Sequence, residues 1–104
     1  MVATTYKVKR AQVGQIDSIE VNGPFNFSDP LIYSIAVQIL EEGKPALAFD
    51  LAKVTYMTSP GIASIVKVLK RVQAANALLY INGATPDMVD LFRLAAVDKF
   101  IRFL

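Results

Sequence analysis

The sequence predicts an α/β fold: a single domain over residues 1–104, in which a mostly parallel, mixed β-sheet of about four or five strands is covered by about four helices. Three observations lead to this fold class. A length of 104 residues suits one domain. After an opening pair of strand-like segments, apolar runs alternate with segments of helical periodicity, which implies crossovers between parallel strands. Three of the helical segments also begin with a capping residue close to a proline.

An antiparallel hairpin at the edge of the sheet opens the chain. Residues 6–12 and residues 16–21 show the apolar and polar alternation of strands, and a short turn around Gly14 joins them. Two strands joined so closely run in opposite directions. The Asn-Gly-Pro run at residues 22–24 is expected to end the second strand, because all three residue types favour turns.

The first helix is expected after an aromatic loop. Phe25 and Phe27 belong to this loop, and their rings lie either in the core or on the surface. Asp29 then caps the helix, Pro30 suits its first turn, and Gly43 suits the left-handed position after its end. The buried stripe follows the helical period and consists of Leu31, Ile32, Ile35, Ala36, Ile39 and Leu40.

A central strand and the second helix come next. Residues 45–51 form an apolar run that suits a strand buried on both faces, and Lys53 is expected to mark a turn before a short strand at residues 54–57. The second helix runs from Pro60 to about residue 75, and Asn76 can end it in the left-handed conformation. The residues expected to face the sheet are Ile62, Ile65, Val66, Leu69 and Val72. Those expected to face outward are Ala63, Ser64, Lys67, Lys70 and Arg71.

The last part of the chain repeats the alternation. Residues 77–81 form another buried strand, and Thr85 and Pro86 start a third helix. Residues 97–100 suit one more helical turn, and residues 101–104 suit a final edge strand. The third helix is expected to bury Met88, Leu91 and Phe92.

The composition excludes several kinds of site. The chain has no Cys and no His, which excludes disulfides, thiolate or imidazole metal ligands, cysteine nucleophiles and a Ser-His-Asp triad. Its 11 basic and 9 acidic residues are too evenly balanced to predict nucleic-acid binding, and its scattered glycines form no phosphate loop. We therefore expect no metal, no cofactor and no nucleic acid. No apolar run reaches the roughly 18 residues that span a bilayer, and residues 1–10 contain no apolar leader, so a cytoplasmic protein without membrane insertion is expected.

Asp50 is the carboxylate that an α/β enzyme could use, because it closes a strand. Together with a divalent metal it would make a small hydrolytic site. No second carboxylate or base lies near it in the stretch that follows, so a structural role in bonding the next turn is favoured. We therefore expect that the protein is not an enzyme.

Residues 54–65 are the best candidate for a functional surface. Thr58 or Ser59 can accept a hydrogen bond from the free N–H groups of the helix's first turn. Pro60 suits the first helical position, and Gly61 is expected to leave the surface bare. A strand that runs into such a helix start is where a doubly wound α/β domain usually meets its ligand or partner. The same residues also fit an ordinary helix cap, so both interpretations stay open on these residues alone.

Residues 48–62 resemble the STAS domain family, which is typified by bacterial anti-sigma factor antagonists. The family pattern is a strand that ends in Asp-Leu or Asp-Phe, followed by Val-x-Phe-Met-Asp-Ser-Ser-Gly-Leu. This chain has Phe-Asp-Leu and then Val-Thr-Tyr-Met-Thr-Ser-Pro-Gly-Ile. The resemblance continues through residues 82–86, 91–92 and 97–103, and it covers the chain from about Ile16 with a matching order of elements. It implies one STAS domain.

The resemblance implies a non-enzymatic regulatory module that binds another protein. The typical family member docks on an anti-sigma factor that is also a serine kinase, through the N-terminus of the second helix. The kinase phosphorylates the second Ser of the Asp-Ser-Ser-Gly motif, and the complex dissociates. A phosphate brings roughly two negative charges, which the helix dipole tolerates at this end but a flat docking surface does not.

This sequence departs from the family pattern around the phosphoacceptor. The acceptor position is Pro60, the motif Asp is Thr58, and the Asp that the family tends to place before the first helix is Asn26. Ser59 matches the first Ser of the pair, so Ser59 and Thr58 are the candidate acceptors. Constitutive binding is favoured over a moved acceptor, because Ser59 is expected to cap the helix, a bond worth about 1 kcal/mol. The predicted partner-binding residues are Phe25, Asn26, Thr58, Ser59, Pro60, Gly61, Ile62 and Ser64.

The alternative interpretation is a constitutive scaffold or accessory STAS subunit of a signalling complex or transport system. The altered acceptor position and the high apolar fraction, 54%, both fit it. A homo-oligomer is also left open, since the hairpin edge and the final strand could pair between chains.

Overall fold

Five strands form one mixed sheet whose spatial order is the same as their order in the sequence, β1-β2-β3-β4-β5. β1 pairs antiparallel with β2, and the other neighbours are parallel. The computed structural model describes residues 5–104, and residues 1–4 of the predicted domain lie outside this range. The predicted fold class and N-terminal hairpin are confirmed, but the described residues contain three α-helices and one short 3₁₀ turn rather than about four helices. The elements are β1 (Lys7–Val13), β2 (Ile16–Phe25), α1 (Pro30–Glu41), β3 (Ala46–Met57), α2 (Ser59–Ala74), β4 (Leu78–Asn82), α3 (Pro86–Leu94), the 3₁₀ turn η1 (Asp98–Phe100) and β5 (Arg102–Phe103).

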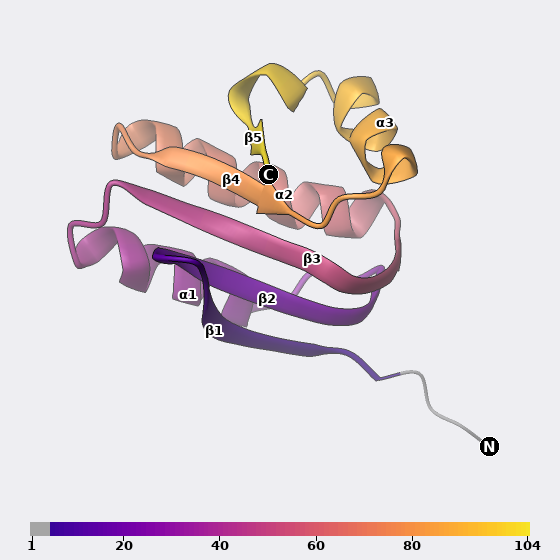
Figure 1. Ribbon diagram of the computed structural model, residues 1–104, viewed down its shortest axis with the longest axis horizontal. Helices are drawn as coiled ribbons and strands as arrows, with labels where there is room; N and C mark the ends of the chain where they lie inside the picture. The colour runs from indigo at the N-terminus through magenta and orange to yellow at the C-terminus, as the bar shows by residue number, and fades with distance from the viewer. Residues whose placement is uncertain (1–4) are drawn as a thin grey trace.

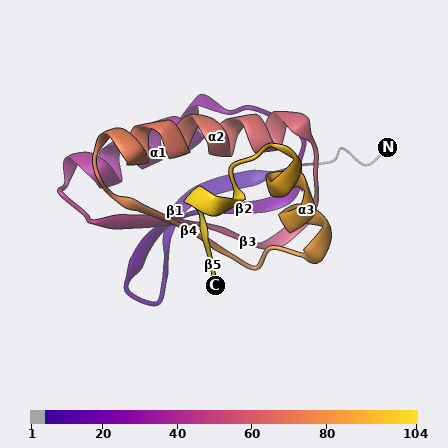
Figure 2. The same cartoon turned by 90° about the horizontal axis from the view of Figure 1, so that it is seen from above.

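The sheet is covered by long helices on one face. α1 and α2 lie side by side on this face, and α3 and η1 lie near the β4–β5 edge (Figures 1 and 2). Right-handed crossovers that always step in the same direction place their helices on the same side, and the strand order here never reverses. Within residues 5–104, no helix covers the opposite face, beyond which the β1–β2 hairpin projects in Figure 2. The sheet is therefore not doubly wound and has no topological switch point.

Two predicted breaks in the strands are wrong, because pairing across the sheet overrides the turn residues. β2 runs through the Asn-Gly-Pro segment to Phe25. Its pairing with β1 stops at Asn22, so Pro24 has no β1 neighbour that needs its missing N–H, and the pairing with β3 shifts register there. β3 likewise runs through Lys53 to Met57; Lys53 pairs with Asn22 of β2, just after another register shift, and is exposed.

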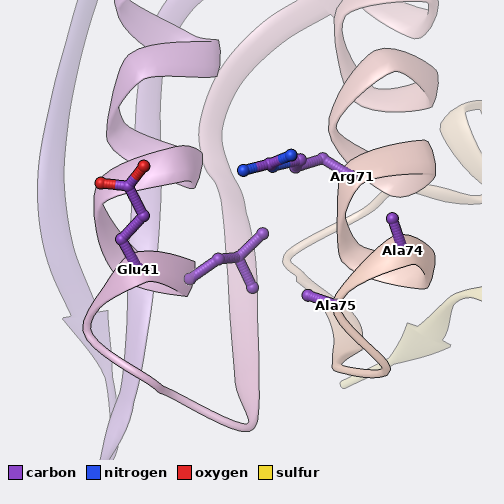
Figure 3. A pocket seen from close by; sticks show the side chains of 5 residues that line it. Glu41, Arg71, Ala74 and Ala75 are labelled. Atoms are coloured by element: carbon purple, nitrogen blue, oxygen red, sulfur yellow. The ribbon is translucent and has the colours of Figure 1, made fainter.

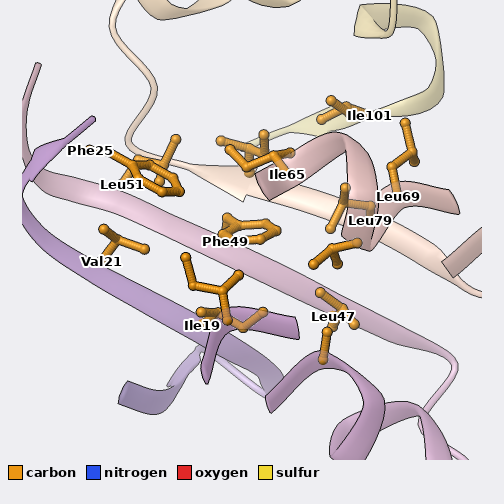
Figure 4. Close-up of a cluster of buried hydrophobic side chains, with 14 of the residues drawn as sticks. Ile19, Val21, Phe25, Leu47, Phe49, Leu51, Ile65, Leu69, Leu79 and Ile101 are labelled. Carbon is orange, nitrogen blue, oxygen red and sulfur yellow. The ribbon is translucent and has the colours of Figure 1, made fainter. Parts of the chain in front are cut away.

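The hydrophobic core lies between the sheet and the α1–α2 layer. Phe49 on the central strand β3 is fully buried, with Ile19 and Val21 of β2 on one side and Leu79 of β4 on the other (Figure 4). Ile65 of α2 packs over the same region and is also fully buried. The central position that the apolar run of β3 predicts is confirmed, but burial on both faces holds only in part: on the face away from the helices Ala48 is buried, whereas Asp50 is half-buried and Ala52 is exposed.

The helix faces agree with the predicted stripes except at their edges. On α1, Leu31 is 46% exposed and Leu40 is half-buried, so the stripe is narrower than predicted. On α2, Val66 is half-buried, whereas Ser64 and Val68 are buried, so the outward placement predicted for Ser64 is wrong. α2 lies against both the sheet and α1, which widens its buried arc beyond a sheet-facing stripe. The remaining buried residues of α1 are Ile32, Ile35, Ala36 and Ile39, all as predicted.

The ends of the elements follow their local signals. Asp29 caps α1 through its carboxylate, and Thr85 caps α3 through its hydroxyl. Gly43 and Asn76 adopt the left-handed conformation after α1 and α2, with φ of +78° and +55°. β5 joins the sheet beside β4, as predicted for the final strand. Among residues 5–104, no helix combines the length and the apolarity needed to cross a bilayer.

Candidate functional site

The candidate site lies where β2 and β3 end and α2 begins. The Thr58 N–H donates to the Phe25 carbonyl at 3.2 Å, which continues the pairing of β2 with β3 into the turn before α2. The loop after β2 and the first turn of α2 are therefore neighbours, although they lie more than thirty residues apart in the chain. The structure brings together two segments that the sequence could place only separately.

Gly61 lets α2 approach β2 closely and does not open a bare surface. It is buried, and a Cβ at this position would meet the Phe25 carbonyl oxygen at a separation that real Cβ atoms essentially never show. The same Cβ would lie 3.0 Å from side-chain carbons of both Met57 and Phe25. The expectation that Gly61 leaves this surface bare is wrong, because its missing side chain points toward the protein rather than toward solvent.

The exposed part of the site is the segment Thr58, Ser59 and Pro60. α2 begins at Ser59, so Thr58 holds the N-cap position and Pro60 is the second helical residue. The prediction that Thr58 or Ser59 caps the helix is wrong. The Thr58 side chain makes no capping hydrogen bond, and Ser59 is already inside the helix. The first turn of α2 also contains no acidic residue, so no side chain of that turn offsets the positive end of the helix dipole.

Three of the predicted partner-binding side chains are buried beneath the exposed segment. Phe25 is fully buried, and Ile62 is almost so. Ser64 is 6% exposed, and its hydroxyl lies 3.3 Å from the Phe27 carbonyl and 3.1 Å from the Pro60 carbonyl. These bonds and contacts fix the loop after β2 against α2. The exposed members of the predicted set are therefore Asn26, Thr58, Ser59 and Pro60, whereas Phe25, Gly61, Ile62 and Ser64 are buried.

Two aromatic residues beside the site were not predicted. The Asn26 side-chain amide donates to the Tyr56 hydroxyl at 3.1 Å, and Tyr56 is 48% exposed. The Tyr6 ring stacks on Phe27 with 3.5 Å between centroids. The Tyr6 hydroxyl donates to Asp29 at 3.0 Å, and this bond to a carboxylate raises the pKa of Tyr6. Tyr56 could have been found from the sequence if β3 had been predicted as one uninterrupted strand that ends beside the predicted surface. The stacking of Tyr6 on Phe27 has no local signal in the sequence.

Asp50 has the structural role that was favoured for it. One of its carboxylate oxygens accepts hydrogen bonds from the Ala52 N–H at 3.1 Å and from the Asn82 amide at 3.2 Å. The carboxylate thereby joins two neighbouring strands on the open face of the sheet. Across residues 5–104, no group of three or more Asp, Glu, His or Cys side chains is placed to hold a metal ion.

One hollow lies far from the exposed segment, and another lies beside it. One, of about 190 Å³, lies between the C-terminal ends of α1 and α2, where Arg71 extends from α2 toward α1 (Figure 3). It is at the far end of α2 from Ser59 and is separate from the candidate site. The other, of about 320 Å³, lies between the end of β3 and α3 and includes Tyr56 in its lining.

Comparison with known proteins identifies the family. The STAS domain model matches residues 11–104, and the chain therefore belongs to the STAS domain family. This membership supports a regulatory protein-binding role. No curated protein matches the chain by sequence.

Solved anti-sigma factor antagonists share the fold. The unphosphorylated form of SpoIIAA is 11% identical, with a TM-score of 0.71 over 96% of this chain and 87% of that chain. An anti-sigma factor antagonist from Mycobacterium paratuberculosis is 15% identical, with a TM-score of 0.74 over 95% and 85%. The phosphorylated form of the Bacillus cell fate determinant SpoIIAA is 10% identical, with a TM-score of 0.61 over 94% and 91%. At these identities the likeness shows the common fold.

Proposed function

We propose that this protein is a non-enzymatic regulatory module that docks on an anti-sigma factor or a related kinase-like protein through the start of α2. The observation that carries this proposal is the exposed Thr58, Ser59 and Pro60 segment, whose hydroxyls are not used to cap the helix. The structure around this segment is firmly held, whereas the segment itself presents small polar groups to solvent.

The firm support favours protein docking. The Phe25 carbonyl, Gly61 and Ser64 fix the underlying turn, and Asn26 is held by its bond to Tyr56. A surface that is already ordered loses little conformational freedom on binding, which favours affinity. The N-terminal start of α2 also offers free backbone N–H groups, and the positive end of the helix dipole, to a hydrogen-bond acceptor on the partner.

Ser59 is the position at which phosphorylation would control docking. Pro60 has no hydroxyl, so it cannot accept the phosphate that the family pattern places there. Constitutive binding is favoured by the sequence only if the Ser59 hydroxyl caps the helix, but Ser59 lies inside α2 and no side-chain cap is formed. A phosphate on Ser59 would sit at the positive end of α2, where the fold tolerates it, and in the middle of the proposed docking surface.

The test is capture of partners from a lysate of the source cells, with and without ATP, followed by mass spectrometry of the captured proteins and of the tryptic peptide 54–67. Two variants sharpen it: Ser59→Glu adds a negative charge at the start of α2, and Gln73→Glu adds the same charge on an exposed site at its far end. We expect the wild-type protein and Gln73→Glu to capture a kinase-like anti-sigma factor, and Ser59→Glu to capture at least tenfold less. Ser59→Glu should also raise the stability by about 0.5 kcal/mol, because it complements the dipole, so its loss of binding is not unfolding.

Comparing capture with and without ATP distinguishes a phosphorylation switch from constitutive binding. Release by ATP with a phosphate on Ser59 or Thr58 identifies a switch at the altered acceptor site. Capture that is indifferent to ATP, with an unmodified peptide, identifies the constitutive scaffold or accessory subunit. Undiminished capture by Ser59→Glu would contradict docking at this surface.

A further inference from the structure

A groove with an apolar interior lies beside the proposed docking surface. It lies between the end of β3 and α3 and has a volume of about 320 Å³. Met57 and Met88 are both buried and form its floor, and Leu91 is half-buried at its side. Thr85 and Asp87 also line it, and because both residues are exposed they belong to its solvent-facing rim. The lining is thus apolar inside and polar outside.

The groove can adapt to what enters it. Methionine side chains are unbranched and polarisable, so a floor made of Met57 and Met88 can fit different apolar shapes. α3, which forms one wall, is nine residues long and buries only Met88 and Phe92. A helix held by so few buried residues can shift slightly against the sheet at low cost.

Asp87 gives the groove an electrostatic preference. It is exposed in the first turn of α3, and none of the side chains in residues 5–104 forms an ion pair with it. Asp90, one turn further along the same helix, pairs with Arg93 at 3.3 Å and does not line the groove. A ligand that places a cation beside its apolar group would therefore meet an unpaired carboxylate at the rim.

We propose that this groove receives an apolar side chain of a polypeptide partner, with an adjacent Lys or Arg of that partner beside Asp87. The inference deepens the proposed function and rests on it. Tyr56 lines the groove and also bonds to Asn26 of the proposed docking surface, so the two are adjacent. A peptide fits better than a small cofactor. The volume is near the lower end for small-molecule sites, and one carboxylate with two threonine hydroxyls is a sparse set of polar groups for holding a cofactor.

The methionines allow a direct test. The chain has three, Met1, Met57 and Met88, and the last two form the floor of the groove. We would label the methionine methyl groups with ¹³C and titrate the full chain with end-blocked peptides Ala-Leu-Arg-Ala, Ala-Leu-Glu-Ala and Ala-Ala-Arg-Ala. We expect saturable shifts of the Met57 and Met88 signals with the Leu-Arg peptide, about threefold weaker binding of the Leu-Glu peptide, and no shift with the peptide that lacks Leu.

Two aspartate variants test the electrostatic part. Asp87→Asn should bind the Leu-Arg and Leu-Glu peptides equally, because it removes the rim charge and keeps the shape. Asp90→Asn, with the same change on the outer face of α3, should keep the threefold preference. Methyl signals that do not move with the Leu-Arg peptide, or a preference that survives Asp87→Asn, would overturn the inference.

The outcome is distinguishable from that of the proposed function. If Ser59→Glu loses its partner while the methionine methyl signals do not shift with the peptides, docking at α2 stands and the groove is not part of it. If the methyls respond and Ser59→Glu still captures its partner, the peptide groove stands and the docking surface at α2 is wrong.

Discussion

The first turns of α1 and α3 are closed by a side-chain cap, and the first turn of α2 is not. The Asp29 carboxylate accepts from the Leu31 N–H at 2.9 Å, and the Thr85 hydroxyl accepts from the Met88 N–H at 3.2 Å. In both helices the proline follows the cap directly. In α2 one extra residue, Ser59, separates the N-cap residue from the proline, and no side-chain cap forms.

The difference shows two ways to hold the start of a helix. α1 and α3 use hydrogen bonds within their own first turns. α2 is held instead by its neighbours, through the close approach of Gly61 to β2 and through the contact of the Ser64 hydroxyl with the Phe27 carbonyl in the loop after β2. Because these contacts lie on the buried side of the turn, the exposed hydroxyls of Thr58 and Ser59 have no capping role to fulfil. Two substitutions test this comparison, the larger expected effect first, and a third, smaller effect concerns the other end of α1.

Gly61→Ala should destabilise the protein by about 3 kcal/mol. A methyl group at this position would collide with the Phe25 backbone, and neither the helix nor the strand end can move without losing its packing. Urea unfolding would measure the loss. Ser59→Ala in the same turn is the control and should change the stability by less than about 0.5 kcal/mol. A Gly61→Ala protein as stable as wild type would mean that α2 is not held by this contact.

Asp29→Ala should cost about 1.5 kcal/mol, whereas Thr58→Ala should cost less than about 0.5 kcal/mol. Asp29 caps α1 and also accepts from the Tyr6 hydroxyl, but the Thr58 side chain makes no capping bond. Both residues hold the N-cap position of their helix, so the difference between the two losses measures the contribution of the side-chain cap to stability. Thermal or urea unfolding compares them, and equal losses would show that Thr58 caps α2 in solution.

Acid should loosen the other end of α1. Arg10 of β1 donates to Glu42 at 2.6 and 2.7 Å and to Asp17 at 3.0 Å. Its guanidinium holds the pKa of Asp17 below 3.8 and that of Glu42 below 4.5. Lowered pKa values mean that these carboxylates stabilise the fold fully above about pH 5 and lose this effect as the pH falls through their folded-state pKa values.

The variant Asp17→Asn tests this link. It should lower the stability at pH 7 by about 1 kcal/mol, because a hydrogen-bonded charge pair is lost. Between pH 5 and pH 3 its urea midpoint should fall less steeply than that of the wild type, since one of the two titrating partners is gone. Parallel pH profiles would show that Asp17 does not contribute to the acid sensitivity.

Local signals in the sequence predicted most of the fold, and contacts between distant segments account for the rest. Asp29, Thr85, Gly43 and Asn76 act within their own turns, so their roles were readable from neighbouring residues. The breaks expected in β2 and β3 did not occur, because strand pairing sets the length of a strand in the sheet.

The structure brings the predicted surface residues of β2, its following loop and α2 together, but the local geometry of this surface was only partly predictable from the sequence. A capping pattern with two adjacent hydroxyl residues does not say which of them begins the helix, and the structure shows that neither side chain caps it. The inward direction of Gly61 depends on where Phe25 lies, and buried Ser64 meets the Phe27 carbonyl of a loop 37 residues away in the chain. Such facts are tertiary, and no short window of sequence contains them.

The path of the first strand matters for how the protein can be tethered. The Thr5 backbone lies against Gly23, and Tyr6 stacks on Phe27, so the chain enters the domain beside the proposed docking surface. The tip of the β1–β2 hairpin lies at the other end of β2, about 30 Å away along a ten-residue strand. A dye, surface anchor or fused domain placed ahead of Thr5 would crowd the proposed docking surface. The same attachment inserted at the hairpin tip would leave that surface free.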